Sequence, residues 1–144
     1  MIVNKMQDTG CKMQDGGLRK PQSYEDTEIY GIAKELAREV HRMTLVELPK
    51  FEMYEEGSQI RRSSKSIVAN IVEGFGRRRY KNEFIQFLTY AVASCDETKV
   101  HLEMLHETES LNRNIFEDLF TGYEELGAKL FNFRGAVIRG HHVS

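Results

Sequence analysis

Four long segments of this chain repeat apolar residues at steps of three and four, and only two prolines occur in its 144 residues. This spacing gathers apolar side chains on one face of a helix. Nowhere does the sequence show the alternation of a strand bounded by turn residues. Amphipathic helices must bury their apolar faces against one another, so the pattern predicts an all-α protein.

The first predicted helix begins at Ser23, a favourable N-cap, and ends before Pro49. The second runs over 58–73, and Gly74 is expected to be the C′ residue just beyond its end. Its seam, the line of apolar or small residues that faces the other helices, consists of Ile60, Ser64, Ile67 and Ile71.

The third predicted helix covers about 81–110 and the fourth about 114–138, with Asn112 or Asn114 as the cap of the fourth. The seam of the third is Phe84, Leu88, Ala91, Cys95, Thr98, Leu102 and Leu105. That of the fourth is Ile115, Leu119, Gly122, Leu126, Leu130, Phe133 and Val137. Short loops between amphipathic helices predict an antiparallel up-down four-helix bundle over 23–140. Residues 1–22 show no apolar period and are expected to form a flexible tail, within which Met13 is an alternative start.

The amino-acid composition narrows the class of protein further. Hydrophobic residues make up 40% and charged residues 29%, as in a soluble globular protein. No apolar run approaches the roughly 20 residues of a membrane span, and the N-terminus lacks a signal-peptide pattern. Cys11 and Cys95 have no disulfide-framework or zinc spacing. We therefore expect a reduced, cytoplasmic protein without a membrane partner.

The sequence offers little support for a metal site or a catalytic site. A di-iron bundle needs Glu-x-x-His on two helices, and this chain has one such pair, Glu103 and His106. We expect His106 to be a partly buried residue with a hydrogen-bond partner. Cys95 lies on an apolar seam, and no nucleophile elbow, P-loop or dinucleotide motif occurs. The expectation is no metal, no cofactor and no enzyme activity.

The net charge of −2 conceals a segregated pattern. Residues 58–81 carry seven bases and one acid, so their net charge is +6. Residues 23–57 carry nine acids and four bases, a net −5, and residues 96–125 carry nine acids and two bases, a net −7. A basic segment thus lies between two acidic ones.

The bases of this segment have two competing interpretations. They contact the phosphates of RNA or DNA, or they pair with the acidic helices within or between subunits. For one monomer both stay open, and repetition around a ring of subunits would favour nucleic acid. The candidate nucleic-acid-binding residues are Arg61, Arg62, Lys65, Arg77, Arg78, Arg79 and Lys81.

A small polar stripe runs beside the seam of the second predicted helix. It consists of Ser63, Ser66, Asn70 and Glu73. Small residues let helices approach closely, and we expect Asn70 and Glu73 to hydrogen-bond across the contact. A helix–helix or subunit contact is therefore the preferred interpretation, ahead of a cryptic catalytic site.

The run from Ser66 to Gly74, Ser-Ile-x-x-Asn-Ile-x-Glu-Gly, extends from Gln59 and continues in Arg77, Phe84, Phe87 and beyond. This pattern resembles the four-helix-bundle proteins encoded in 23S rRNA intervening sequences, over about 24–137; accessory proteins of diversity-generating retroelements look like relatives. The resemblance implies a bacterial bundle, often a barrel-like homopentamer. In the retroelement branch it also implies binding to a reverse transcriptase and to nucleic acid.

The resemblance carries no catalytic residues to this chain. It implies that the matching residues Ser66, Asn70, Glu73 and Gly74 determine the fold or the assembly. The leading hypothesis is a non-enzymatic, ring-like homo-oligomer, with a pentamer expected from the resemblance, that binds RNA or DNA as a scaffold or accessory factor. The alternative is a protein-interaction module, for example a reverse-transcriptase accessory protein, whose basic surface meets an acidic partner. The choice between RNA and DNA stays open.

Overall fold

A computed structural model describes residues 23–140, and within that range it contains four α-helices, two 3₁₀ turns and no strand. The predicted tail at 1–22 lies outside the described residues. The α-helices are α2 (Glu28–Val46), α3 (Glu56–Gly76), α4 (Lys81–Glu107) and α5 (Arg113–Ile138). The 3₁₀ turns are η2 (Tyr24–Asp26), before α2, and η3 (Lys50–Glu52), between α2 and α3.

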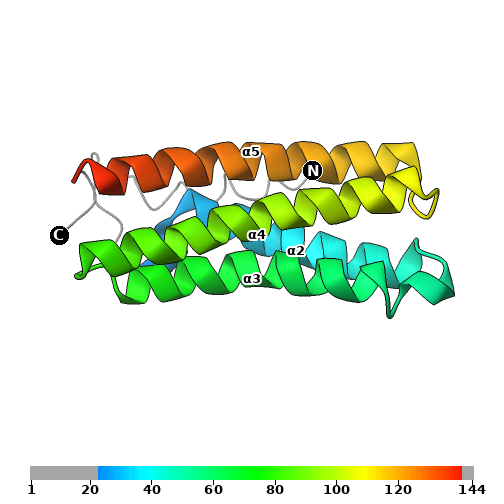
Figure 1. Cartoon of the computed structure of the whole chain (residues 1–144), viewed down its shortest axis with the longest axis horizontal. Coiled ribbons are helices and arrows are strands. Elements are labelled where there is room, and N and C mark those ends of the chain that lie inside the picture. Colours follow the sequence, from blue (N-terminus) through cyan, green and yellow to red (C-terminus); the bar gives the residue numbers. More distant parts are fainter. Residues whose placement is uncertain (1–22, 141–144) are drawn as a thin grey trace.

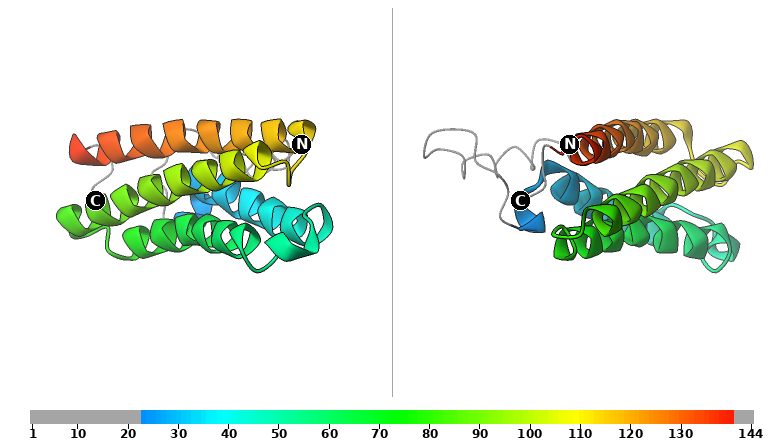
Figure 2. Two further views of the ribbon diagram at one scale, coloured as in Figure 1. Left: turned by 45° about the vertical axis from the view of Figure 1, so that its right-hand side comes forward. Right: turned by 60° about the vertical axis from the view of Figure 1, so that its left-hand side comes forward.

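The helices lie side by side along one long axis, and each runs opposite to the one before it in the chain (Figures 1 and 2). Contacts join α3 to α4, α4 to α5, α2 to α3 and α2 to α5, so every helix has two neighbours. The predicted all-α, four-helix class is confirmed. The α3–α4 connection and the end of α5 lie at one end of the molecule; the α2–α3 and α4–α5 connections lie at the other.

Helix boundaries differ from the prediction at several places: α3 begins at Glu56 rather than at 58, and α4 ends at Glu107 rather than near 110. The N-cap of α2 is Thr27, whose hydroxyl accepts a hydrogen bond from the Tyr30 amide (3.3 Å), whereas Ser23 accepts from Glu25 within the preceding turn. Gly74 is not a C′ residue: α3 continues to Gly76, because Phe75 extends the buried face of the helix. Asn112 caps α5 as predicted, accepting from the Ile115 amide (3.0 Å).

The predicted seams form the core. Every seam residue predicted for the third helix is buried in α4. In α5 the predicted Leu119, Leu126, Leu130 and Val137 are buried, and Tyr123, which the seam omitted, is fully buried beside them. Burial of a large apolar side chain stabilises the fold by about 1.5–3 kcal/mol, so this continuous core holds the four helices together.

At the end of the bundle opposite the α3–α4 connection, a buried carboxylate joins the loops. Glu52 is 7% exposed. One of its oxygens accepts from the Glu56 amide at the start of α3 (3.3 Å), and the other accepts from the Ser110 hydroxyl after α4 (3.0 Å). Gly57 makes this packing possible, since a Cβ there would lie 2.6 Å from the Glu52 carbonyl oxygen.

Candidate nucleic-acid interface

The structure divides the basic segment into two groups. Arg61, Arg62 and Lys65 lie in the first half of α3, while residues 77–81 follow its last turn. At about 1.5 Å per residue, the 12 steps from Lys65 to Arg77 separate the groups by about 18 Å. The two groups therefore face different surroundings and are considered separately.

Arg61 has partners inside the protein. Its Nη1 donates to the Thr44 hydroxyl on α2 (2.9 Å), and its Nη2 donates to the Met53 carbonyl oxygen in the α2–α3 connection (2.8 Å). Thr44 is completely buried. These bonds satisfy a buried polar group and a loop carbonyl, so Arg61 holds α3 against α2 and has fewer donors to offer a phosphate.

Arg62 and Lys65 are exposed. Lys65 also borders a shallow groove of about 440 Å³ between α2 and α3, which we call the α2–α3 groove. Small apolar residues and basic residues line it together. Its lining consists of Lys34, Ala37, Arg38, His41, Lys65, Val68 and Ala69.

At the other end of α3, Arg77 is held by two carboxylates. Its Nε and Nη2 donate to Glu73 (3.2 and 3.0 Å) and its Nη1 donates to Glu83 on α4 (2.9 Å). The guanidinium also lies over the Phe87 ring, 5.2 Å from its centroid. The hydrogen bond to Glu83, and to a smaller extent those to Glu73, raise the pKa of Arg77 above its ordinary value. Arg77 thus links the last turn of α3 to α4.

The rest of the α3–α4 connection is more open. Arg78 donates to the Phe75 carbonyl oxygen (2.9 Å) and lies over the Phe75 ring. Arg79 and Lys81 are exposed and have no ion-pair partner within residues 23–140. Between them Tyr80 is 62% exposed. This stretch of five residues contains four bases and no acid.

A further base reaches the same end of the molecule from a distant part of the chain. Arg139, the C-cap of α5, is exposed. Sequence patterns did not reveal it as a candidate, although an antiparallel topology places the end of the fourth helix beside the connection between the second and third. We call residues 77–81 together with Arg139 the basic end.

The residues of the Ser66–Gly74 motif follow the contact between α3 and α4. The Ser66 and Ser94 hydroxyls are 3.0 Å apart across the two helices, and Asn70 Nδ2 donates to the Ser66 carbonyl oxygen (2.9 Å) and hydroxyl (3.1 Å). A Cβ at Gly74 would lie 3.2 Å from the Phe87 Cβ, so glycine permits this close approach. Cross-helix bonds of the stripe therefore come from Ser66 and from Ser63, whose hydroxyl accepts from Thr98 on α4 (2.8 Å). The cross-helix bonds expected from Asn70 and Glu73 do not form: Asn70 bonds within α3, and Glu73 accepts from Arg77 at the end of the same helix.

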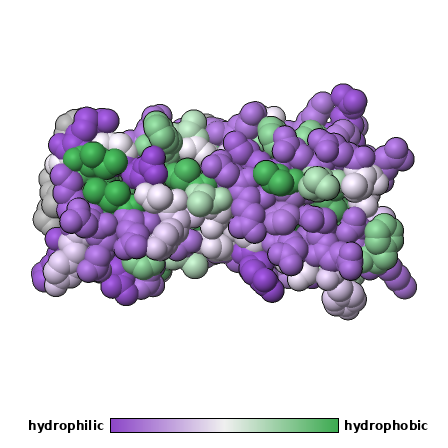
Figure 3. Space-filling model, viewed as in Figure 1, coloured by the Kyte–Doolittle hydropathy of each residue, from purple (hydrophilic) through white to green (hydrophobic). Residues whose placement is uncertain are grey.

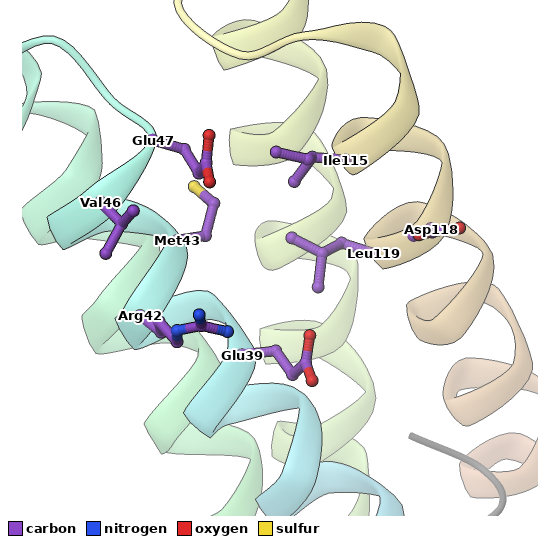
Figure 4. Close-up of a pocket in the computed structure, with 8 residues that line it drawn as sticks. All are labelled: Glu39, Arg42, Met43, Val46, Glu47, Ile115, Asp118 and Leu119. Carbon is purple, nitrogen blue, oxygen red and sulfur yellow. The ribbon is translucent and has the colours of Figure 1, made fainter. Parts of the chain in front are cut away.

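The opposite end of the bundle is unsuited to phosphate. Segment 47–55 carries three acids and one base. A cavity of about 190 Å³ near this end lies between α2 and α5, whose side chains face one another across it (Figure 4). Glu39, Glu47 and Asp118 line this cavity beside Arg42. Three carboxylates against one guanidinium disfavour an anionic ligand.

The other candidates from the sequence, His106 and Cys95, lie in surroundings that suit a structural role. The His106 Nδ1 lies 3.3 Å from the Leu111 carbonyl oxygen, and its ring stacks on Phe116 at 4.5 Å, as expected for a partly buried histidine. Burial raises the pKa of the Cys95 thiol to about 12.

No group of three or more His, Cys, Asp and Glu that could hold a metal occurs among the described residues. Within the same range, no helix is long and apolar enough to cross a membrane.

The face over α3, α4 and α5 is mainly hydrophilic, with separate apolar groups (Figure 3). Scattered apolar side chains of this kind are normal on a protein surface and do not by themselves mark a binding site. Charge is therefore the feature that distinguishes the basic end from the rest of the bundle.

Comparisons with known proteins agree with this architecture. The family described as 23S rRNA-intervening sequence protein matches residues 25–132. A crystal structure of a protein of unknown function from the S23 ribosomal protein family of Bacteroides thetaiotaomicron is 25% identical, with a TM-score of 0.69. That alignment covers 74% of this chain and 95% of the other. No curated protein matches. On the extent of the family match and the shared helical fold, this chain belongs to the 23S rRNA-intervening sequence protein family.

Proposed function

We propose that this protein is a non-enzymatic, oligomeric four-helix bundle that binds RNA or DNA through its basic end, as a scaffold or accessory factor. The observation that carries the proposal is the pair of exposed cations Arg79 and Lys81, which have no ion-pair partner in the described part of the chain. Like charges placed this close repel one another unless a ligand neutralises them.

Nucleic acid suits this arrangement because its phosphates are regularly spaced anions. Each phosphate that a lysine or arginine neutralises releases condensed counterions, which supplies affinity without any base-specific contact. Arg77 is already paired with Glu73 and Glu83, so its role is to hold the connection in place. Arg79, Lys81 and Arg139 remain to contact the strand, and Arg62 and Lys65 extend the basic surface along α3.

Assembly is part of the proposal. A homopentamer is the state that the family resemblance implies, and a ring would present the basic end several times to one nucleic acid. The α2–α3 groove, whose lining includes Ala37 and Ala69, offers a surface on which a neighbouring subunit can pack. Light scattering should then give a mass about five times the 16.7 kDa of one chain.

The same groove favours the second candidate function, a protein-interaction module. The apolar residues Ala37, Val68 and Ala69 line it together with the bases Lys34 and Lys65. An amphipathic acidic segment of another protein would match both features. This alternative predicts a stable protein complex and weak binding to nucleic acid.

The experiment that separates these functions is a titration of labelled RNA and DNA with the purified full chain, followed by fluorescence anisotropy at about 50 and about 200 mM salt. The proposed function predicts binding at the lower salt that weakens steeply at the higher. Absence of binding at the lower salt would contradict it and favour the protein partner.

A further inference from the structure

The side chain of Tyr80 makes no hydrogen bond and no ring contact among the described residues. Its side chain is 62% exposed and makes no capping hydrogen bond, although it occupies the N-cap position of α4. An aromatic ring held in water at the centre of a basic loop is not required for phosphate contact. Together with the exposed bases Arg79 and Lys81 on either side of it, the ring suits a ligand that has both anionic groups and flat apolar surfaces.

Two more aromatic residues follow Tyr80 along α4. Phe87 and Tyr90 lie seven and ten residues further on, spacings that return to the same side of a helix. Their ring centroids are 5.6 Å apart, and Tyr90 is 45% exposed. Arg77 covers Phe87 on this side of the helix.

This flank extends the contact surface beyond the loop. At about 1.5 Å per residue, Tyr80 and Tyr90 lie about 15 Å apart along α4. That length exceeds the roughly 3.4 Å rise of one nucleotide in a stacked strand several times over. The surface is therefore long enough to follow several consecutive nucleotides.

The geometry points to a single-stranded nucleic acid as the ligand of the basic end, with an unpaired base stacked on the Tyr80 ring while Arg79 and Lys81 contact the flanking phosphates. Bases of a duplex are paired and already stacked on one another, so their faces are not accessible to Tyr80. A single strand can turn a base out, and aromatic side chains among cations bind such strands with little sequence preference. This inference rests on the proposed function, since it assumes that the basic end binds nucleic acid.

The test compares four labelled probes of about 20 nucleotides: a thymidine strand, a uridine strand, an abasic strand of the same length, and a random-sequence duplex. The abasic strand keeps the phosphates and removes the stacking partner. Tyr80→Ala should weaken binding of the two base-containing strands by about 5-fold to 150-fold, the range that base–aromatic stacking covers. Tyr80→Phe should bind almost as well as the native chain, because its ring still stacks.

Two features of the design isolate the ring. Tyr80→Ala removes no charge, so the salt dependence and the affinity for the duplex and the abasic strand should stay unchanged. The matched control is Tyr54→Ala: Tyr54 is 82% exposed and lies in the acidic connection at the opposite end of the bundle. Its loss should alter none of the four affinities.

The outcomes distinguish this inference from the function on which it rests. Unchanged affinity of Tyr80→Ala for the thymidine and uridine strands, with salt-dependent binding retained, would overturn base stacking and leave phosphate contact in place. Equal losses for Tyr80→Ala and Tyr54→Ala would also overturn it. If the native chain binds none of the four probes, the proposed function fails as well.

Discussion

Removal of two cations from the basic end should change how binding responds to salt. The double variant Arg79→Ala, Lys81→Ala deletes exposed bases that have no ion-pair partner within residues 23–140. Both residues lie outside the core, so we expect the fold and thermal unfolding to stay close to those of the native chain. Circular dichroism would check this before binding is measured.

The size of the change in salt dependence follows from the number of phosphates that the variant no longer neutralises. Each neutralised phosphate contributes about −0.7 to the slope of log affinity against log salt on a single strand, and about −0.9 on duplex DNA. Two phosphates therefore account for about −1.4 or about −1.8 for each subunit that engages the nucleic acid. When the salt rises from about 50 to about 200 mM, the affinity of both proteins falls. The factor by which the variant's affinity falls should be about 7 times smaller than the native factor on a single strand, and about 12 times smaller on a duplex.

The assay is anisotropy at four or more salt concentrations, and the control removes the same charge elsewhere. Lys50 and Arg113 are exposed bases at the opposite end of the bundle. Lys50→Ala, Arg113→Ala should leave the slope as it is in the native chain, because neither residue belongs to the basic end. An equal change of slope in both double variants would show that overall charge, not the basic end, governs binding, and would refute the reasoning.

Two further predictions concern the core. The buried Tyr123 hydroxyl has no hydrogen-bond partner among the described residues. Tyr123→Phe should therefore raise the free energy of unfolding in urea by about 1 kcal/mol or more; a loss of stability would mean that the hydroxyl is bonded. For Cys95, burial raises the pKa to about 12, so the folded state keeps a proton that the unfolded state loses above about pH 9. The free energy of unfolding should therefore fall as pH rises from about 9 to about 12, by up to about 1.4 kcal/mol per pH unit from this group. In Cys95→Ala it should fall less steeply over the same range, and equal slopes in the two proteins would contradict the raised pKa of Cys95.

The helices and most of their buried faces could be predicted because period and burial are local properties of the sequence. The seam of α4 is the clearest instance, since all seven predicted residues are buried. The predicted seam of α5 contains Gly122, whereas the buried residue at this level is its neighbour Tyr123. A Cβ at Gly122 would lie 2.8 Å from the Leu36 Cδ2, so the glycine marks a close approach to α2 that a heptad pattern does not contain.

Helix ends were harder to predict because neighbours decide them. Ser23 and Thr27 are both good caps, and the α-helix begins at the second. Gly74 followed the last residue of the predicted helix and had the residue type of a C′ position. The buried Phe75 continues α3, and its ring packs against Phe84 at 5.2 Å between centroids. That packing joins residues of two helices, so the sequence of α3 alone could not reveal it.

The candidate site could be assembled only in part from the sequence. The basic residues could be counted, but their partners depend on tertiary structure: Arg61 bonds to Thr44 across two helices, while Arg79 has no such neighbour in the described range. Arg139 joins the basic end from 58 residues beyond Lys81. The preferred interpretation of Ser66 as part of a helix–helix contact agrees with its approach to Ser94.

The central claim is that nucleic acid contacts this protein at the end that carries the α3–α4 connection. Photo-crosslinking of a strand containing 4-thiothymidine, followed by mass spectrometry of the labelled peptides, measures this contact directly. We expect crosslinks at residues 77–90, with further labelling near Arg139. Crosslinks concentrated at residues 47–56, in the acidic connection at the opposite end, would contradict the claim.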